Sequence, residues 1–353
     1  MPFALSEFYQ QTKSARKIIV VDFGFLGDSV HMVPALWEIK RNYPVAQLHT
    51  LSAELGAEVL KLAPCVDVAC GFPLGAKSPP WWRGLGLLQK LRREKFDLAI
   101  NFSGADRTIF VTAYTGAKWR VAQQGSRNHF WAKWLIPHWV PRQQNDVIVS
   151  EQRRRMLATL GMSLQPPRFD LSIPESAKTW ASNNIPQRAI HFSINASSFV
   201  KEWPVENWIQ LANKVLNADP YSNIVVTASP RQREQERLRA FAEGIQSKRV
   251  ATITSVTIPQ LAALLQRCIL QIGGDSGVTH LAAAVGTSTF SFLRDYPAIK
   301  DWMLTGENHR RIVVPCDCIN RKETVCETAG KSKCLAGISA EGAFAMIREQ
   351  LLR

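Results

Sequence analysis

Residues 273–292 hold the densest set of groups able to bind a phosphate. The stretch reads GGDSGVTHLAAAVGTSTFSF and follows the apolar run 269–272, which predicts a buried strand. A helix is expected at 278–285, directly after the glycines. A strand, a glycine turn and a helix together aim backbone N–H groups and a positive helix end at an anion. The pattern predicts a nucleotide or another phosphorylated ligand here, with an ordinary strand–helix turn as the alternative.

A second glycine loop, Gly24–Asp28, follows the expected strand Lys17–Phe23. It lacks the G-x-G-x-x-G spacing of a dinucleotide fingerprint. It also places the Asp28 carboxylate where the next helix begins, which suits the helix dipole but repels a pyrophosphate. Two interpretations stay open: Asp28 is a general base that takes a proton from an attacking hydroxyl, or it is a helix N-cap. His31, one turn later, either lines the same site or is structural.

Lys201 is the cation best placed in the second half of the chain. It follows the expected strand Ala189–Ile194 and precedes a helix whose first residues we expect to be Pro204 and Val205. There it would either neutralise a phosphate or be solvated. Glu234, which follows another expected strand, would either accept hydrogen bonds from ribose hydroxyls or carry surface charge.

These residues need a scaffold that brings the ends of several strands together. Apolar runs that alternate with amphipathic segments predict further strands at 47–51, 98–102, 224–228, 250–253 and 288–292, and helices at 53–62 and 340–352. Strands alternating with helices imply parallel sheets. Residues 161–188 hold four prolines and predict an interdomain linker. We expect two successive α/β units and a two-lobed enzyme with a cleft between the lobes.

The composition limits the classes of protein and partner. The chain has 353 residues, of which 46% are hydrophobic, and no apolar run approaches the roughly 20 residues that cross a bilayer. Its N-terminus lacks the apolar core of a signal peptide, which predicts a cytoplasmic protein. The net charge is +14, and the first 170 residues hold 22 Lys and Arg against 13 Asp and Glu. An acidic partner is expected: nucleic acid, an anionic membrane surface or a phosphorylated glycolipid.

Four of the seven cysteines lie within 19 residues, at Cys316, Cys318, Cys326 and Cys334. Such a group could hold zinc or iron, but its spacing lacks the usual C-x2-C pairs. Reduced thiols or a redox-dependent bridge are the alternatives. We expect no metal to be required for activity.

Three motifs in this order resemble the ADP-heptose:lipopolysaccharide heptosyltransferases, glycosyltransferase family 9. They are GDSVH at 27–31 with PAL at 34–36, K-x-W-P at 201–204 with Trp208, and DSG-x-x-HLAAA-x-G at 275–286. The resemblance runs from about Lys17 to the last helix. It implies the GT-B fold, in which two Rossmann-like α/β domains face each other across a cleft. The expected domains are an acceptor-binding one at 1–170, a nucleotide-sugar-binding one at 171–337, and a C-terminal helix at 338–353 that packs back on the first.

The resemblance also implies a role for individual residues. Asp28 matches the proposed base, and Lys201 matches the lysine that stabilises the phosphates. The donor-binding positions match Gly27, Glu234, Asp275, Ser276, Gly277 and His280. Asp275 would lie near the sugar. Residues 293–297 (LRDYP) stand where family members often carry a Gly-Pro-Thr-Asp-like turn, which leaves the donor sugar open.

The expected function is inverting transfer of L-glycero-D-manno-heptose from ADP-heptose to a lipopolysaccharide inner-core acceptor of the Kdo-lipid A type, without a cofactor. The basic, Trp-rich segments Trp81–Lys95 and Lys118–Trp139 would face the inner leaflet of the membrane, to which the protein would bind peripherally. The alternatives are a relative that uses another sugar or a protein acceptor, an NAD-dependent oxidoreductase, and a nucleic-acid-binding protein. The broken glycine fingerprint argues against the oxidoreductase, and the lack of a recognition module argues against nucleic acid.

Overall fold

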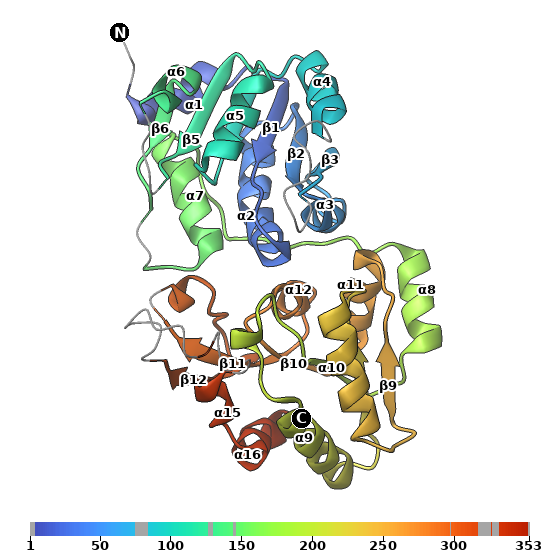
Figure 1. Cartoon of the computed structure of the whole chain (residues 1–353). Helices are drawn as coiled ribbons and strands as arrows, with labels where there is room; N and C mark the ends of the chain where they lie inside the picture. Colours follow the sequence, from blue (N-terminus) through green and yellow to red (C-terminus); the bar gives the residue numbers. More distant parts are fainter. Residues whose placement is uncertain are drawn as a thin grey trace. The chain divides into compact units, whose positions relative to one another are not determined.

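Each half of the chain folds around its own six-stranded parallel sheet (Figure 1). The computed structural model describes residues 4–74, 84–125, 130–143, 146–296, 298–316, 326 and 332–351. Two units result, Met1–Ser172 and Ile173–Arg353, which places the boundary two residues beyond the expected one.

The first sheet has the strand order β3-β2-β1-β4-β5-β6. Its strands are β1 (Lys17–Val21), β2 (Gln47–Ala53), β3 (Val68–Phe72), β4 (Leu98–Asn101), β5 (Trp119–Gln123) and β6 (His138–Val140). The helices of this unit are α1 (Phe8–Thr12), α2 (Leu26–Asn42), α3 (Glu54–Leu60), α4 (Leu85–Arg93), α5 (Asp106–Tyr114), α6 (Ala132–Leu135) and α7 (Val149–Thr159), with the short helix η1 (Leu5–Glu7).

The second sheet has the order β12-β11-β10-β7-β8-β9. Its strands are β7 (Ala189–Ser193), β8 (Asn223–Thr227), β9 (Val250–Ile253), β10 (Leu270–Gly274), β11 (Thr289–Asp295) and β12 (His309–Pro315). Its helices are α8 (Glu175–Asn184), α9 (Val205–Ala218), α10 (Gln232–Glu243), α11 (Ile258–Arg267), α12 (Gly277–Ala284), α15 (Lys333–Ala336) and α16 (Ala340–Leu351), with the short helices η3 (Phe199–Lys201) and η4 (Ile299–Asp301).

Both sheets have one point where the strand order reverses. In the first sheet β1 pairs with β4, and in the second β7 pairs with β10. Loops that leave the carboxyl ends of such neighbouring strands diverge, and ligands bind in the crevice that this leaves. Asp28 lies in the first turn of α2, the helix that follows β1, the loop after β7 carries Lys201, and the loop after β10 carries Asp275. The topology thus places all three predicted residues at reversal points.

Apolar strands and amphipathic helices explain why each unit folds as it does. The KIIVV run of β1 is buried from its second residue on, as expected of a central strand covered on both faces. Helix α9 buries one stripe against the second sheet, formed by Trp208, Leu211, Ala212, Val215 and Leu216. Trp203, just before α9, stacks on Phe292 of β11 with ring centroids 4.3 Å apart. This stacking ties the loop that carries Lys201 to the sheet.

Two sequence-based expectations need correction. The expected linker contains helix α8, because Ala177 and Ala181 bury one of its faces. Helix α9 begins at Val205, and Pro204 is its extended N-cap.

The last helix was expected to pack on the N-terminal domain. In the second unit α16 packs against α9, and its Ala343, Ile347 and Leu351 join the core of that unit. Packing of this helix on the first unit stays a prediction. A spacing of i, i+4 and i+8 gives this helix one apolar stripe, which does not by itself specify its partner. Within the described ranges, no helix is long and apolar enough to cross a membrane.

Candidate functional site

The loop after β10 brings an acid, a serine and a helix end together. Asp275 follows the last residue of β10, Ser276 is the extended N-cap of α12, and Gly277 is the first residue of this helix. The first backbone N–H groups of a helix have no partner within it, so they and the helix dipole favour an anion at this end. Gly274 is needed because a Cβ there would lie 2.9 Å from the Lys201 carbonyl oxygen. The glycine lets two loops of the site approach each other.

Lys201 and Asp275 form the polar centre of this site. Lys201 Nζ lies 2.6 Å from Asp275 Oδ2, and both side chains are partly exposed. The Tyr296 hydroxyl donates a hydrogen bond of 2.9 Å to the same carboxylate oxygen. Burial, and then the neighbouring Asp275, raise the pKa of Tyr296, so the phenol keeps its proton and remains a donor. The cation and the acid predicted from the sequence therefore meet, and a tyrosine holds the acid.

The side chains of Tyr296 and Arg294 extend this centre. The ring of Tyr296 lies under the Lys201 ammonium at 5.9 Å and the Arg294 guanidinium at 5.8 Å. Arg294 is buried and also points a guanidinium nitrogen at the Cys316 sulfur, 3.9 Å away. The two cations near the ring help to hold it in place, which supports the hydrogen bond to Asp275.

The start of α12 is braced by short hydroxyl contacts. Thr279 Oγ1 donates to the Gly274 carbonyl oxygen over 3.0 Å and lies 3.3 Å from Ser276 Oγ. Thr279 is buried, so this brace lies beneath the loop rather than in the ligand's path. Ser276 keeps a partly exposed hydroxyl at the helix end.

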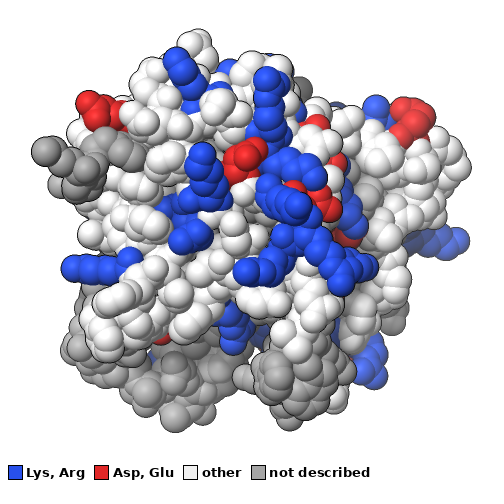
Figure 2. Space-filling view, turned by 90° about the horizontal axis from the view of Figure 1, so that it is seen from above, with Lys and Arg blue, Asp and Glu red and all other residues white. Residues whose placement is uncertain are grey.

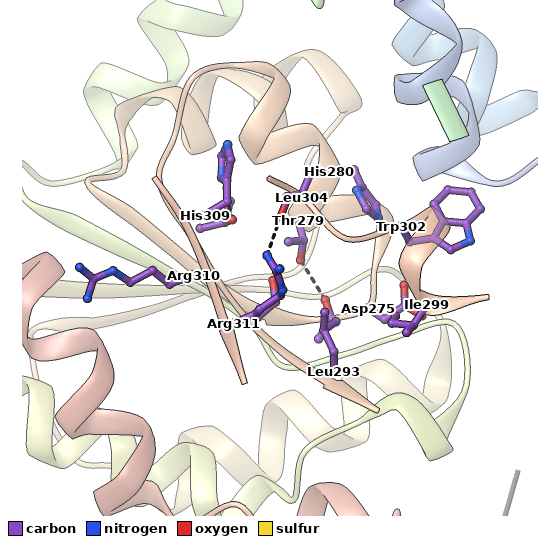
Figure 3. Close-up of a pocket in the computed structure, with 13 residues that line it drawn as sticks. Asp275, Thr279, His280, Leu293, Ile299, Trp302, Leu304, His309, Arg310 and Arg311 are labelled. Carbon is purple, nitrogen blue, oxygen red and sulfur yellow. Dashed lines mark hydrogen bonds between the residues drawn. The ribbon is translucent and has the colours of Figure 1, made fainter. Parts of the chain in front are cut away.

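His280 lines a small pocket beside the loop. Figure 3 shows the side chains of Asp275, Thr279 and His280 along it, with Trp302 next to His280. The ring centroids of His280 and Trp302 lie 5.7 Å apart. Burial lowers the pKa of His280 to about 4, against the opposing influence of Asp275. The imidazole is therefore neutral near pH 7 and can act only as a neutral hydrogen-bonding group.

A buried carboxylate supports the loop that carries Lys201. Glu202 accepts the N–H of Ala196 over 3.0 Å and the Arg233 guanidinium over 2.7 Å. Arg237 donates to the carbonyl oxygens of Ile194 and Trp203, each over 2.9 Å. Helix α10 thus anchors both ends of the loop and limits the positions that Lys201 can take.

Glu234, the expected ribose-binding acid, lies in the first turn of α10. One of its carboxylate oxygens accepts the N–H of Ser229 over 3.0 Å, and the other lies 3.9 Å from Arg231. The residue stands after β8 on the same edge of the sheet as Lys201 and Asp275. It contacts neither of them in the described structure, so it belongs to the site by position alone.

In the first unit, Asp28 is the third residue of α2 and Phe25 is the N-cap. The carboxylate of Asp28 reaches back and accepts the N–H of Phe25 over 2.8 Å, a role typical of an acid at this position. Gly27, the second residue of the helix, is buried beneath it. A Cβ at Gly24 would lie 2.2 Å from the Asp28 Cβ, so only glycine leaves room for this carboxylate.

Arg153, far away in the sequence, holds the same helix end. Its guanidinium donates over 2.5 Å to the Asp28 carbonyl oxygen and over 2.5 Å to Asp22 Oδ2. The distance from Arg153 Nη2 to Asp28 Oδ1 is 3.6 Å. Burial raises the pKa of Asp28, Arg153 lowers it, and Asp22 raises it. A carboxylate with a raised pKa is better suited to accept a proton than an ordinary one.

The cysteines give no metal site that the structure describes. Cys318 lies outside the described residues, as does Trp81 of the expected membrane-facing segment. Cys316 and Cys326 are buried, and Cys334 lies 3.2 Å from the Ser332 hydroxyl. In the part of the chain that is described, no three His, Cys, Asp or Glu side chains are grouped so as to hold a metal ion.

Sequence reasoning missed several residues that shape the site. Tyr296 was part of a turn noted only as a departure from a family pattern. Arg153 is 125 residues from Asp28, and no local motif marks it. Nothing in the sequence distinguishes Glu202, beside Lys201, from a charged surface residue. Its arginine partners become visible only in the structure.

Comparisons with known proteins place the chain among related sequences. The family model described as "Glycosyltransferase family 9 (heptosyltransferase)" matches residues 85–300. Lipopolysaccharide heptosyltransferase 3 of Escherichia coli is 25% identical over 277 residues, which are 76% of this chain and 80% of the relative.

Solved structures share the fold over nearly their whole length. A glycosyl transferase family 9 protein from Veillonella parvula superposes with a TM-score of 0.76 at 19% identity, covering 96% of this chain and 97% of that one. The E. coli heptosyltransferase WaaC with ADP-2-deoxy-2-fluoro heptose gives a TM-score of 0.70 at 18% identity and covers 94% and 99%.

Proposed function

Because this chain belongs to glycosyltransferase family 9, the heptosyltransferases, we propose that it transfers L-glycero-D-manno-heptose from ADP-heptose to a phosphorylated lipopolysaccharide inner-core acceptor. It is a glycosyltransferase with the GT-B fold that the sequence predicted. The donor, the acceptor and the catalytic residues are the parts that we infer.

The observation that carries the proposal is the ion pair between Lys201 and Asp275 at the start of α12. A diphosphate leaving group needs cations and N–H donors, and a sugar needs hydroxyl acceptors. Lys201 and the helix end, with Ser276 and Gly277, supply the first set. The Asp275 carboxylate supplies an acceptor for sugar hydroxyls, so groups suited to the diphosphate and to the sugar lie side by side.

Asp28 is the proposed base of an inverting displacement. The acceptor oxygen forms a bond to the anomeric carbon while the bond from that carbon to the β-phosphate oxygen breaks. The acceptor proton passes to the Asp28 carboxylate, and the electron pair leaves with ADP. The raised pKa of the Asp28 carboxyl suits this role, since a base works best when its pKa lies closer to the working pH.

The remaining donor contacts follow from position. Glu234, on the same sheet edge, would accept the ribose hydroxyls, and neutral His280 would donate one hydrogen bond near the diphosphate. A related structure, WaaC, was solved with an ADP-heptose analogue, which supports ADP-heptose as the donor class. The proposal requires no metal or other cofactor, because Lys201 and the N–H groups would take up the developing charge.

A surface of the first unit suits the expected anionic membrane. Phe110 of α5 stacks on Trp131 with ring centroids 4.6 Å apart, and Trp134 of α6 is 84% exposed. Figure 2 shows Lys and Arg side chains gathered on the face seen from above. Lys90, Arg92 and Arg93 lie in the last turn of α4. Exposed tryptophans and cations are typical of proteins that bind the headgroup region. We infer peripheral association with the inner leaflet.

Titration calorimetry tests the donor site. ADP-heptose and ADP should bind to the wild-type chain, whereas UDP and NADH should not. Binding of NADH would favour the oxidoreductase, and binding of ADP with another sugar would favour a relative that transfers that sugar. If none of the adenine nucleotides binds, the proposal is wrong.

Sedimentation with phosphatidylglycerol vesicles tests the membrane surface. The wild-type chain should sediment at low salt, and Trp134→Ala should sediment less. Equal sedimentation with neutral and anionic vesicles would contradict peripheral binding through this surface.

A further inference from the structure

Arg153 is held between two carboxylates at the carboxyl end of the first sheet. Its guanidinium lies 2.5 Å from Asp22 Oδ2 and 3.6 Å from Asp28 Oδ1. We propose that Asp22 and Arg153 are a positioning pair that orients Asp28 and keeps its carboxylate ready to take a proton. The proposal rests on the proposed function, because it gives Asp28 the role of base.

The orientation follows from two hydrogen bonds. Arg153 Nη1 donates to the main-chain oxygen of Asp28 over 2.5 Å, which fixes the first turn of α2. The N–H of Phe25 occupies Asp28 Oδ2 over 2.8 Å. Oδ1 then has the Arg153 guanidinium nearby but beyond hydrogen-bond distance. One carboxylate oxygen is thus fixed, and the other is left to accept the substrate proton.

Asp22 decides how much of the Arg153 charge reaches Asp28. A short, direct pair between an arginine and a carboxylate strongly favours the ionised acid and makes it a poor base. Here Arg153 is bonded to Asp22 instead, and both of these side chains are only about 5% exposed. Asp22 is itself held, because its other oxygen accepts the N–H of Gly24 over 3.0 Å. The arginine can therefore orient Asp28 without neutralising its basicity.

The charges around Asp28 come from two elements. In the described part of the chain they are Arg153 from α7 and Asp22 after β1, and they act on the pKa of Asp28 in opposite directions. Burial raises this pKa, and the N–H of Phe25 lowers it. Removing either charged partner should thus shift the titration of Asp28, and the two shifts should have opposite signs.

Carbon-13 NMR of the Asp28 carboxyl group in the full chain measures this directly, with the resonance assigned by its loss in Asp28→Asn. Asp22→Asn should lower the pKa of Asp28, since it leaves the whole Arg153 charge facing that residue. Arg153→Gln should raise it. Arg153→Lys keeps the charge and should move the pKa less than Arg153→Gln. Arg155→Gln removes the same charge from an exposed position of α7 and should leave the resonance unmoved.

The acid limb of kcat/KM for heptose transfer should shift in the same order. An unmoved Asp28 resonance in Asp22→Asn, or shifts of the same sign in Asp22→Asn and Arg153→Gln, would overturn the positioning pair. If Arg153→Gln does not fold, Asp22→Asn and Arg153→Lys still test whether the positioning pair acts on Asp28. If the wild-type chain transfers no heptose, the proposed function fails, while the NMR titration still reports whether the pair acts on Asp28.

Discussion

Lys201 Nζ lies 2.6 Å from Asp275 Oδ2, although the two residues are 74 positions apart in the sequence. They meet because β7 and β10 are neighbours at the reversal point of the second sheet. The cation that we propose for phosphate binding is therefore held beside Asp275, and Tyr296 keeps this acidic partner hydrogen-bonded. A donor that took up the Lys201 charge would leave Asp275 with one bond to Tyr296 and free lone pairs for sugar hydroxyls.

Replacing Lys201 by alanine should slow transfer. Loss of one group that stabilises the developing charge typically costs on the order of 10²–10³-fold in kcat. Steady-state kinetics measures this, with Lys214→Ala as the matched control, because Lys214 pairs with Glu341 on the surface of the second unit. Equal rates for the two variants would remove Lys201 from the mechanism.

Replacing Tyr296 by phenylalanine should affect the sugar more than the nucleotide. The hydroxyl donates to a charged group, and such a hydrogen bond contributes about 1.5–3 kcal/mol, so the KM for ADP-heptose should rise about tenfold or more. The Kd for ADP should stay near the wild-type value. Titration calorimetry with both ligands checks this. A matching loss of ADP affinity would mean that Tyr296 supports the whole loop and not the sugar position.

Replacing Gly24 by alanine should displace Asp28. The added Cβ would lie 2.2 Å from the Asp28 Cβ, which no side chain can accommodate without movement. We expect transfer to be lost while ADP binding to the second unit is retained. Gly86→Ala is the control, because its Cβ would meet nothing within 4 Å. Full activity of Gly24→Ala would show that the position of Asp28 does not matter.

Acid should destabilise the second unit through His280. Burial lowers its pKa to about 4, below the ordinary value of 6.5. Between these values the unfolded chain binds a proton that the folded chain does not, so the free energy of unfolding falls as the pH drops through this range. Denaturant unfolding at several pH values should show a shallower fall for His280→Gln. The same slope in both proteins would mean that His280 does not titrate in this way.

Local patterns predicted much of the scaffold. Apolar runs identified the central strands, for example β7, predicted at Ala189–Ile194 and observed at Ala189–Ser193, because buried parallel strands are continuously apolar. The strands β3, β5, β6 and β12 were not predicted. The β12 run, HRRIVVP, begins with charged residues because it lies at the edge of its sheet, where one side is exposed.

The candidate site was predicted only where a residue and its role share one loop. Asp275, Ser276 and Gly277 are contiguous, so glycine-turn chemistry identified them. Arg153 and Tyr296 act through contacts across 125 and 21 positions, and these contacts exist only after the sheets have formed.

Mass spectrometry of a Kdo-lipid A acceptor incubated with ADP-heptose tests the central claim most directly. We expect the wild-type chain to add one heptose and release ADP. We expect Asp28→Asn to lose on the order of 10²–10⁴-fold in rate while still binding ADP. No heptose on the acceptor despite tight binding of ADP-heptose, or unchanged transfer by Asp28→Asn, would contradict it.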